Sequence, residues 1–189
     1  MKPKIYIDTN LISHLSDLMM GSDDFRITDK QAEALLAICD LDVDLVTSKK
    51  MLDEVFRSKN LKQRALLTML ATLAAKVPYK DITYFTAATF GSVPFGAATF
   101  GGGFSQTDPL LIGLEKIFDP DDSEHIFQAV KNDCSYFLTL DRSTILNRAK
   151  SKPVDMKRLC PEMQFADPEE LLSLLKTKFK NLGSSQSPS

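Results

Sequence analysis

KIYIDTNLISHLSD, residues 4 to 17, decides the fold, because within it a strand signal gives way to a helix signal. The run IYI at residues 5 to 7 is β-branched and aromatic, which predicts a buried strand. From residue 11 to residue 19, leucine, isoleucine and methionine recur at helical spacing and predict a helix. Asp8 stands between the two, so an acid ends a strand that belongs in the core.

The same succession of strand and helix signals recurs along the chain. Strands are predicted at residues 43–46, in LDVDLVTS, at 136–140, in YFLTL, and at 163–166, in MQFA. The strand at 136–140 again runs straight into an acid, Asp141. Helices are predicted between and after these strands, over residues 29–39, 49–57, 60–76, 108–118, 122–131 and 143–150 and from 168 onward.

Strands separated by helices require crossover connections, which favour a parallel sheet covered on both faces. The sequence therefore predicts an α/β fold, namely a three-layer α/β/α sandwich with a mainly parallel central sheet. A chain of 189 residues that is 43% hydrophobic suffices for one well-buried core. We expect a single domain over residues 1–180 and a flexible tail over 181–189.

Residues 79–106 interrupt this pattern with a segment rich in phenylalanine and glycine. Phe85, Phe90, Phe95 and Phe100 are spaced by five, which matches neither a helix nor a strand. The spacing favours an insertion whose phenylalanines fold onto the edge of the core. Stacking on nucleic-acid bases, a mobile lid and a subunit contact remain open as alternatives.

Composition points to a cytoplasmic protein outside the membrane. The 23 basic and 25 acidic residues nearly cancel, so any binding to nucleic acid must come from a local patch. The three cysteines form no CxxC motif, which argues against both a disulfide framework and a cysteine zinc site. No run of apolar residues is long enough to span a bilayer or to resemble a signal peptide.

Four acids are predicted to meet at one edge of the sheet. In open α/β sheets ligands bind outside the carboxyl ends of the strands, where Asp8 and Asp141 lie. Glu54, inside the helix after the second strand, and Asp122, at the start of the helix before residues 136–140, can join them. Carboxylates this close favour a cation, and oxygen ligands suit Mg²⁺ or Mn²⁺ rather than Zn²⁺. A water on such an ion can attack a phosphodiester.

Each acid also has an ordinary structural explanation. Asp8, Asp122 and Asp141 stand where helix N-caps are expected, and Glu54 fits a solvated helix face. The joint pattern favours the metal site, because two buried strands end in acids and two more acids stand between them in order.

Other polar residues near these acids are predicted to play supporting roles. Thr9, Asn10 and Thr139 are predicted to hold carboxylates or waters in place. His14 and His125 are predicted to be structural or surface residues, because neither has metal-ligand spacing to another histidine or cysteine.

The four acids and their flanking residues resemble the PIN-domain ribonucleases of VapC-like type. The family places a small polar residue after the Asp of its first strand, as in IYIDTN, and an acid in the helix after the second strand, as in TSKKMLDEVFR. An Asp then opens a helix that ends before a strand, as in DSEHIFQAVKN, and T-x-D follows, as in FLTLD. Carried over by position, the acids are Asp8, Glu54, Asp122 and Asp141.

The resemblance implies a Mg²⁺- or Mn²⁺-dependent endoribonuclease with RNA as its substrate. Small stand-alone members of the family are often toxins of toxin–antitoxin pairs, so a protein antitoxin and a second copy of the chain are the implied partners. Asp121 and Glu124 are rivals of Asp122 for the third acid. Asp122 is preferred because it stands seven residues before Ala129.

Cationic residues near the acids are predicted to contact RNA phosphates, namely Lys49, Lys50, Arg57 and Arg142. A phosphatase of the haloacid dehalogenase kind is disfavoured, because Asn10 stands where that site needs a second Asp. A PIN-like RNA-binding or assembly module without turnover is the main alternative to the enzyme.

Overall fold

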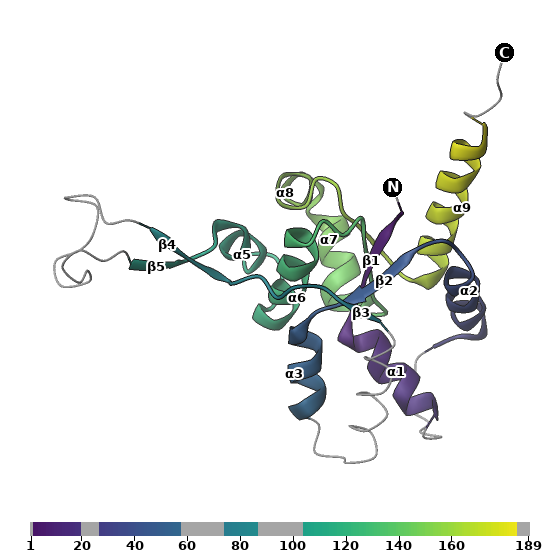
Figure 1. The fold of residues 1–189 in the computed structure, drawn as a ribbon, viewed down its shortest axis with the longest axis horizontal. Coiled ribbons are helices and arrows are strands. Elements are labelled where there is room, and N and C mark those ends of the chain that lie inside the picture. The colour runs from purple at the N-terminus through teal and green to yellow at the C-terminus, as the bar shows by residue number, and fades with distance from the viewer. Residues whose placement is uncertain (1, 20–26, 58–73, 87–103, 185–189) are drawn as a thin grey trace.

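A five-stranded sheet lies at the centre of the computed structural model, which describes residues 2–19, 27–57, 74–86 and 104–184 (Figure 1). The middle strand, β1 (Lys4–Ile7), pairs with β2 (Asp44–Thr47) on one side and β6 (Tyr136–Leu138) on the other. The edge strands are β3 (Ala75–Lys76) and β7 (Gln164–Ala166), and the order is β3-β2-β1-β6-β7. Every pairing is parallel, as the sequence predicted.

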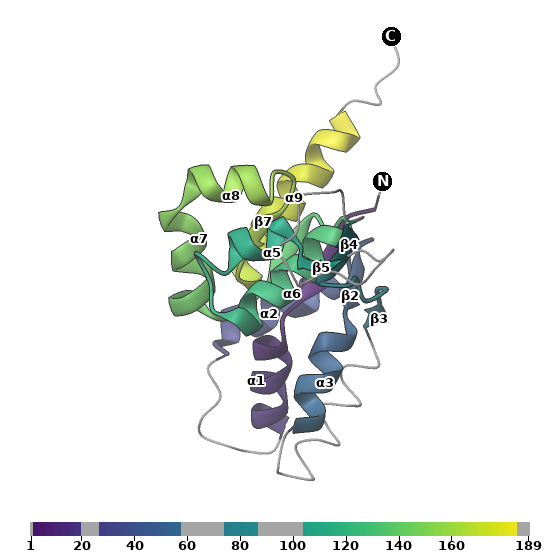
Figure 2. The same cartoon turned by 90° about the vertical axis from the view of Figure 1, so that its left-hand side faces the viewer.

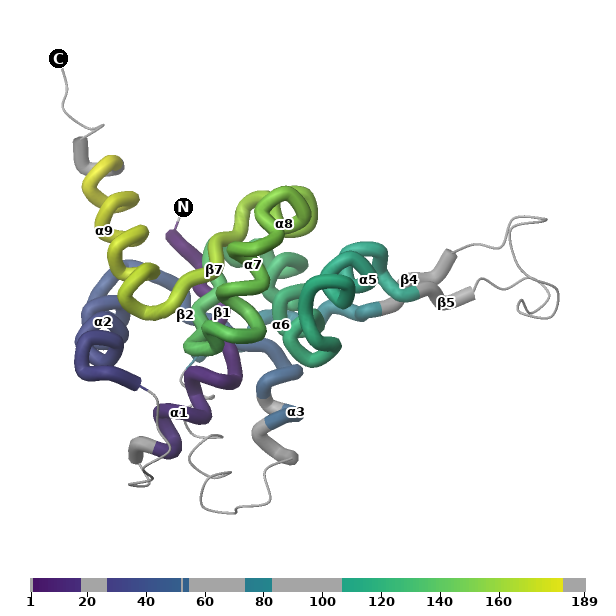
Figure 3. Tube along the Cα trace, turned by 180° about the vertical axis from the view of Figure 1, so that it is seen from behind, coloured from purple at the N-terminus to yellow at the C-terminus, as the bar shows by residue number. Residues whose placement is uncertain are grey.

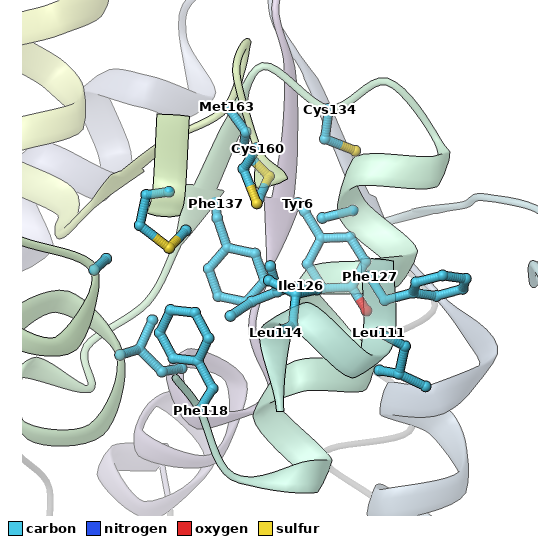
Figure 4. Packing of buried hydrophobic residues seen from close by; sticks show 14 of the residues in the cluster. Tyr6, Leu111, Leu114, Phe118, Ile126, Phe127, Cys134, Phe137, Cys160 and Met163 are labelled. Atoms are coloured by element: carbon cyan, nitrogen blue, oxygen red, sulfur yellow. The ribbon is translucent and has the colours of Figure 1, made fainter. Parts of the chain in front are cut away.

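Alternate residues of the central strands face opposite sides of the sheet. Ile5 and Ile7 belong to one hydrophobic cluster, whereas Tyr6 belongs to the other. Phe137 of β6 lies beside Tyr6 in the parallel register, and the two rings stack with centroids 5.4 Å apart (Figure 4). Both faces of these strands are therefore buried, which is why their sequences are apolar without alternation.

Helices cover both faces of the sheet (Figures 2 and 3). One face is covered by α1 (Thr9–Met19), α2 (Asp29–Cys39) and α9 (Pro168–Ser184), and α2 packs against α9. The other is covered by α5 (Pro109–Leu114), α6 (Pro120–Lys131) and α8 (Pro153–Leu159). The fold is thus α/β with a parallel sheet, compatible with the predicted three-layer sandwich.

Two further helical segments follow strands of the sheet. Helix α3 (Lys49–Arg57) begins two residues after β2. A π-helical turn, η1 (Arg142–Leu146), follows β6 and continues directly into α7 (Asn147–Ser151). Both start at the carboxyl ends of strands, where the sequence placed the candidate site.

Residues 79–106 include a two-stranded ribbon that the sequence did not predict. Strands β4 (Thr83–Thr86) and β5 (Phe104–Thr107) pair antiparallel, with Thr83 opposite Thr107. The ribbon extends away from the central sheet (Figure 1). Strands of four residues carry too little alternation to be recognised when their partner is distant in sequence. Phe90, Phe95 and Phe100 lie outside the described residues, so their predicted contact with the core remains a prediction.

Other boundaries differ from the prediction as well. The helix expected over residues 60–76 is wrong at its end, because Ala75 and Lys76 form β3; residues 58–73 are not described. Helix α8 was not predicted, and α9 continues to Ser184, into the start of the expected tail. In the described ranges, no helix has the length and apolar character needed to cross a membrane.

Candidate active site

Asp8 and Thr139 meet where β1 and β6 end. The parallel register pairs Ile7 with Leu138, and the backbone N–H of Asp8 donates to the carbonyl of Leu138 at 3.0 Å. The next residue of each strand therefore lies beside the other. The hydroxyl of Thr139 donates a hydrogen bond to Oδ2 of Asp8 at 2.6 Å, and both side chains are buried. Thr139 thus holds the Asp8 carboxylate in place, as the sequence predicted.

Asp141 is joined to the same group through the backbone and caps the turn that follows. Its N–H donates to the hydroxyl oxygen of Thr139 at 3.0 Å. Its Oδ1 accepts hydrogen bonds from the Thr144 N–H at 2.7 Å and the Ser143 hydroxyl at 3.0 Å. The capping role considered for Asp141 is therefore confirmed, and it fixes the carboxylate at the edge of the site.

Thr144 connects Asp141 to Asp122 of α6. The Thr144 hydroxyl donates to Oδ2 of Asp122 at 3.1 Å. Two threonines thereby link Asp8, Asp141 and Asp122 into one hydrogen-bonded chain at the carboxyl ends of β1 and β6. These residues are far apart in sequence, and the parallel sheet brings them together.

Glu54 of α3 reaches this group through His125. Nε2 of His125 lies 2.9 Å from Oε1 of Glu54 and 3.2 Å from the hydroxyl of Thr9, which directly follows Asp8. Nδ1 of the same ring lies 2.9 Å from the Tyr6 hydroxyl, which in turn lies 2.6 Å from the Ser48 hydroxyl. Both ring nitrogens of His125 are therefore held. Tyr6 of β1 contacts one and Glu54 contacts the other, so His125 links Glu54 to strand β1.

His125 is the site residue that sequence reasoning missed. It was predicted to be structural or on the surface; it is 2% exposed, which contradicts the surface alternative and agrees with the structural one, and it lies between Glu54 and Thr9. The signal was its position three residues after Asp122, since residues i and i+3 share one face of a helix. Metal-ligand spacing was the wrong criterion here, because the partners of His125 come from other elements.

The pKa values of these groups reflect crowding of negative charge in a buried place. Burial raises the pKa of Asp8, and charge on Glu54 adds to this effect. Burial, with the charges of Asp8 and Asp141, raises the pKa of Asp122 to about 6. The surroundings of Asp8 and Asp122 therefore do not fully compensate the negative charge of these two carboxylates.

The pKa values of Glu54, His125 and Asp141 shift in the direction that favours their charged forms. Burial opposes the charged forms of Glu54 and His125, but their mutual contact outweighs it, lowering the pKa of Glu54 and raising that of His125. Burial likewise opposes ionisation of Asp141, but hydrogen bonds from Thr144 and Ser143 lower its pKa overall. Glu54 and Asp141 are thus ionised at neutral pH.

Lys50 contacts both rival acids and also lies near Glu54 of the candidate site. Its Nζ lies 2.7 Å from Asp121, 2.9 Å from Glu124 and 3.7 Å from Glu54. Asp121 and Glu124 are therefore engaged with Lys50, whereas Asp122 faces Thr144 and feels the charges of Asp8 and Asp141. The geometry favours Asp122 as the third acid.

The predicted RNA-contacting cations differ in their surroundings. Lys49 is exposed, whereas the side chain of Lys50 is 7% exposed and its ammonium group is shared by carboxylates. Arg142 is exposed and pairs with Asp167 at 2.7 Å. The side chain of Arg57 lies outside the described part of the structure. An RNA phosphate would therefore compete with carboxylates for Lys50 and Arg142.

Every acid of the site accepts a hydrogen bond from a protein donor. In the part of the chain described here, no group of three or more His, Cys, Asp or Glu side chains is arranged to hold a metal ion. Asn10, predicted to support the acids, lies in α1 with a buried Oδ1 that lacks a hydrogen-bond partner in the described region. Its predicted supporting role remains a prediction.

No protein-family model and no curated protein matches this chain.

Proposed function

We propose that this chain is a PIN-like, metal-dependent endoribonuclease that hydrolyses RNA phosphodiester bonds through Asp8, Glu54, Asp122 and Asp141. The observation that carries the proposal is the hydrogen-bonded chain from Asp8 through Thr139 and Thr144 to Asp122, with Asp141 between them. Glu54 joins it through His125 and Thr9. The proposal includes the PIN-like fold, RNA as substrate and, from the family resemblance, an antitoxin and a second copy as partners.

The chemistry of the four side chains suits a hard divalent cation, although the described side chains are not arranged around one. Its candidate ligands are carboxylate oxygens, which Mg²⁺ and Mn²⁺ prefer. The raised pKa values of Asp8 and Asp122 indicate negative charge that a cation would neutralise. When bound, such an ion activates a water for attack on the phosphodiester and stabilises the leaving oxygen.

The chain's own residues supply orientation. Thr139 fixes Asp8, and Thr144 fixes both Asp122 and Asp141. His125, held by Tyr6, fixes Glu54. Rotation of the Glu54 side chain would lower the rate of cleavage, because reacting groups must be positioned within about an ångström.

Cleavage of a mixed single-stranded RNA pool tests the proposal. We expect the wild-type chain to cut RNA with Mn²⁺ or Mg²⁺ and to stop in EDTA, and we expect Asp8→Asn to lose the activity. Asp155→Asn is the matched control, because it makes the same change in α8, where Asp155 pairs with Arg158. Equal cutting by the wild type and Asp8→Asn, or no cutting by the wild type with either metal, would refute the enzyme.

A PIN-like RNA-binding or assembly module without turnover is the second candidate. It is favoured by the protein donors that already satisfy the acids and by Lys50, whose ammonium lies beside Glu54. Binding of uncleaved RNA by the wild type with Mn²⁺ present, unchanged in Asp8→Asn, would support this candidate over the enzyme.

A further inference from the structure

A cavity of about 640 Å³ opens directly beside the candidate site. It lies between α1, the start of α2 and the turn after β6, and Asn10 and Asp141 form part of its wall. Its volume falls within the range of about 300–1,000 Å³ found for small-ligand sites. Asp141 belongs both to the wall of the cavity and to the candidate site, so the two adjoin at this residue.

The wall of this cavity is mainly polar. Asn10, Gln31 and Thr28 contribute amide and hydroxyl groups, and His14 contributes an aromatic ring. Proteins that read single-stranded RNA stack an unpaired base on an aromatic or histidine ring and bind its edges through hydrogen bonds. The cavity offers both kinds of group.

Two polar atoms in this wall lack protein partners. Oδ1 of Asn10 and Nδ1 of His14 are buried and have no hydrogen-bond partner within the described ranges. Buried polar atoms in folded proteins nearly always have a partner. A rotation that brought either atom to face a bound molecule would therefore break no hydrogen bond of that atom.

The charges around the cavity suit a nucleotide better than a free anion. Lys30 and Arg142 are balanced by Asp141 and Glu169, all of which belong to the wall. One terminal nitrogen of Arg142 donates a hydrogen bond to Asp167. A guanidinium has five N–H donors, so further N–H groups of Arg142 remain for a phosphate. Charge alone therefore gives little attraction, and a ligand must also use the neutral polar groups.

We propose that this cavity binds one unstacked nucleotide of the RNA next to the cleaved bond. Its base lies against His14 and Asn10, and its phosphate lies toward Lys30 and Arg142. The assignment of the ligand to RNA rests on the proposed function, but binding in the cavity does not require cleavage.

The chain has two histidines, so its ring C–H spectrum is simple: each ring gives one Cε1–H and one Cδ2–H signal, and the Cε1–H signal is the one followed in a proton NMR spectrum. His14→Gln identifies the His14 signal. We expect at least one ribonucleoside 5′-monophosphate, in EDTA, to shift that signal saturably at millimolar concentration, whereas inorganic phosphate does not. Lys30→Ala should weaken binding about fivefold, equivalent to one hydrogen bond of average strength. Lys157→Ala, an exposed lysine in α8, is the matched control and should bind like the wild type.

Each outcome separates this proposal from the nuclease. An unmoved His14 signal, or the same shift with inorganic phosphate, overturns the nucleotide site even if Asp8-dependent cleavage is found. A saturable nucleotide shift without metal-dependent cleavage supports the nucleotide site and refutes the nuclease. A shift that Lys30→Ala and Lys157→Ala weaken equally also overturns the proposal, because it would show no role for this cavity.

Discussion

The hydroxyl of Thr139 donates a 2.6 Å hydrogen bond to the carboxylate of Asp8, across 131 positions of sequence. The contact exists because β1 and β6 are parallel neighbours and both end at the same edge of the sheet. Thr139 also accepts the N–H of Asp141. One side chain therefore sets the distance between two of the candidate acids.

Thr139→Val should remove both hydrogen bonds of the Thr139 hydroxyl while changing the volume of the side chain little. The buried carboxylate of Asp8 would lose its donor, and the N–H of Asp141 would lose its acceptor. We expect the free energy of unfolding to fall by about 1–3 kcal/mol and the pKa of Asp8 to rise further. Urea denaturation at pH 7 measures the first effect. Thr139→Ser keeps the hydroxyl and should lose less than half as much stability.

Asp122→Asn should make the metal-free protein more stable at neutral pH. The pKa of Asp122 is raised from 3.8 to about 6, so the folded state holds a proton that the unfolded state releases between these values. This contribution favours folding below about pH 4 and is lost as pH rises through about 6. Discounted for solvent screening of a half-buried group, it is about 1 kcal/mol.

Urea denaturation in EDTA at pH 4 and pH 7 checks this sign. Asn keeps an oxygen to accept the Thr144 hydroxyl, so the gain of the variant over the wild type should appear at pH 7 and shrink at pH 4. A variant that is less stable than the wild type at pH 7 would contradict the raised pKa. Saturating Mn²⁺ should reverse the order by stabilising the wild type more.

Tyr6→Phe should impair cleavage while leaving the core intact. The ring still stacks on Phe137, but Nδ1 of His125 and the hydroxyl of Ser48 lose a partner. Because His125 holds Glu54, we expect kcat to fall about 10- to 100-fold, the usual cost of removing a group that orients a metal ligand. Steady-state cleavage of a fluorescent RNA measures kcat and KM separately.

Tyr136→Phe is the matched control, because its ring packs in the hydrophobic cluster on the other face of the sheet. It should cut RNA at the wild-type rate. Equal losses in both variants would mean that Tyr6 acts through general stability rather than through His125.

Lys50→Gln should destabilise the fold, in contrast to Lys49→Gln. The ammonium of Lys50 lies beside the carboxylates of Asp121, Glu124 and Glu54. Burial opposes its charged form, but Asp121 and Glu124 outweigh this and raise the pKa of Lys50. We expect a loss of about 1–2 kcal/mol, intermediate between exposed and buried ion pairs. Thermal unfolding at low salt measures it.

Lys49→Gln should leave the melting temperature unchanged, because the side chain is exposed. If Lys49 contacts an RNA phosphate, its loss should reduce the salt dependence of RNA binding by about one unit of slope. Fluorescence anisotropy over a salt series measures this slope. An unchanged slope would remove Lys49 from the RNA-contacting residues.

The sequence by itself determined the parallel sheet and the positions of the acids along it. Buried strands show as short runs such as IYI and YFL, and an acid placed just after a parallel strand must lie at the sheet's carboxyl edge. Asp8 follows β1 directly, whereas Asp141 stands three residues after β6, which ends at Leu138 and not at the predicted residue 140. Asp8 and Asp141 could therefore be placed from local pattern alone. The capping role of Asp141 was also foreseen, because a cap depends on neighbouring residues only.

Only the tertiary structure decided which groups face one another around those acids. The rotation of α6 turns Asp122 toward Thr144 and Asp121 and Glu124 toward Lys50, and it brings His125 against Glu54. The engagement of Lys50 by carboxylates and the pairing of β4 with β5 likewise join segments that no local pattern connects. Hydrogen bonds and ion pairs act over a few ångströms, so their partners follow from the packing of whole elements and not from spacing along the chain.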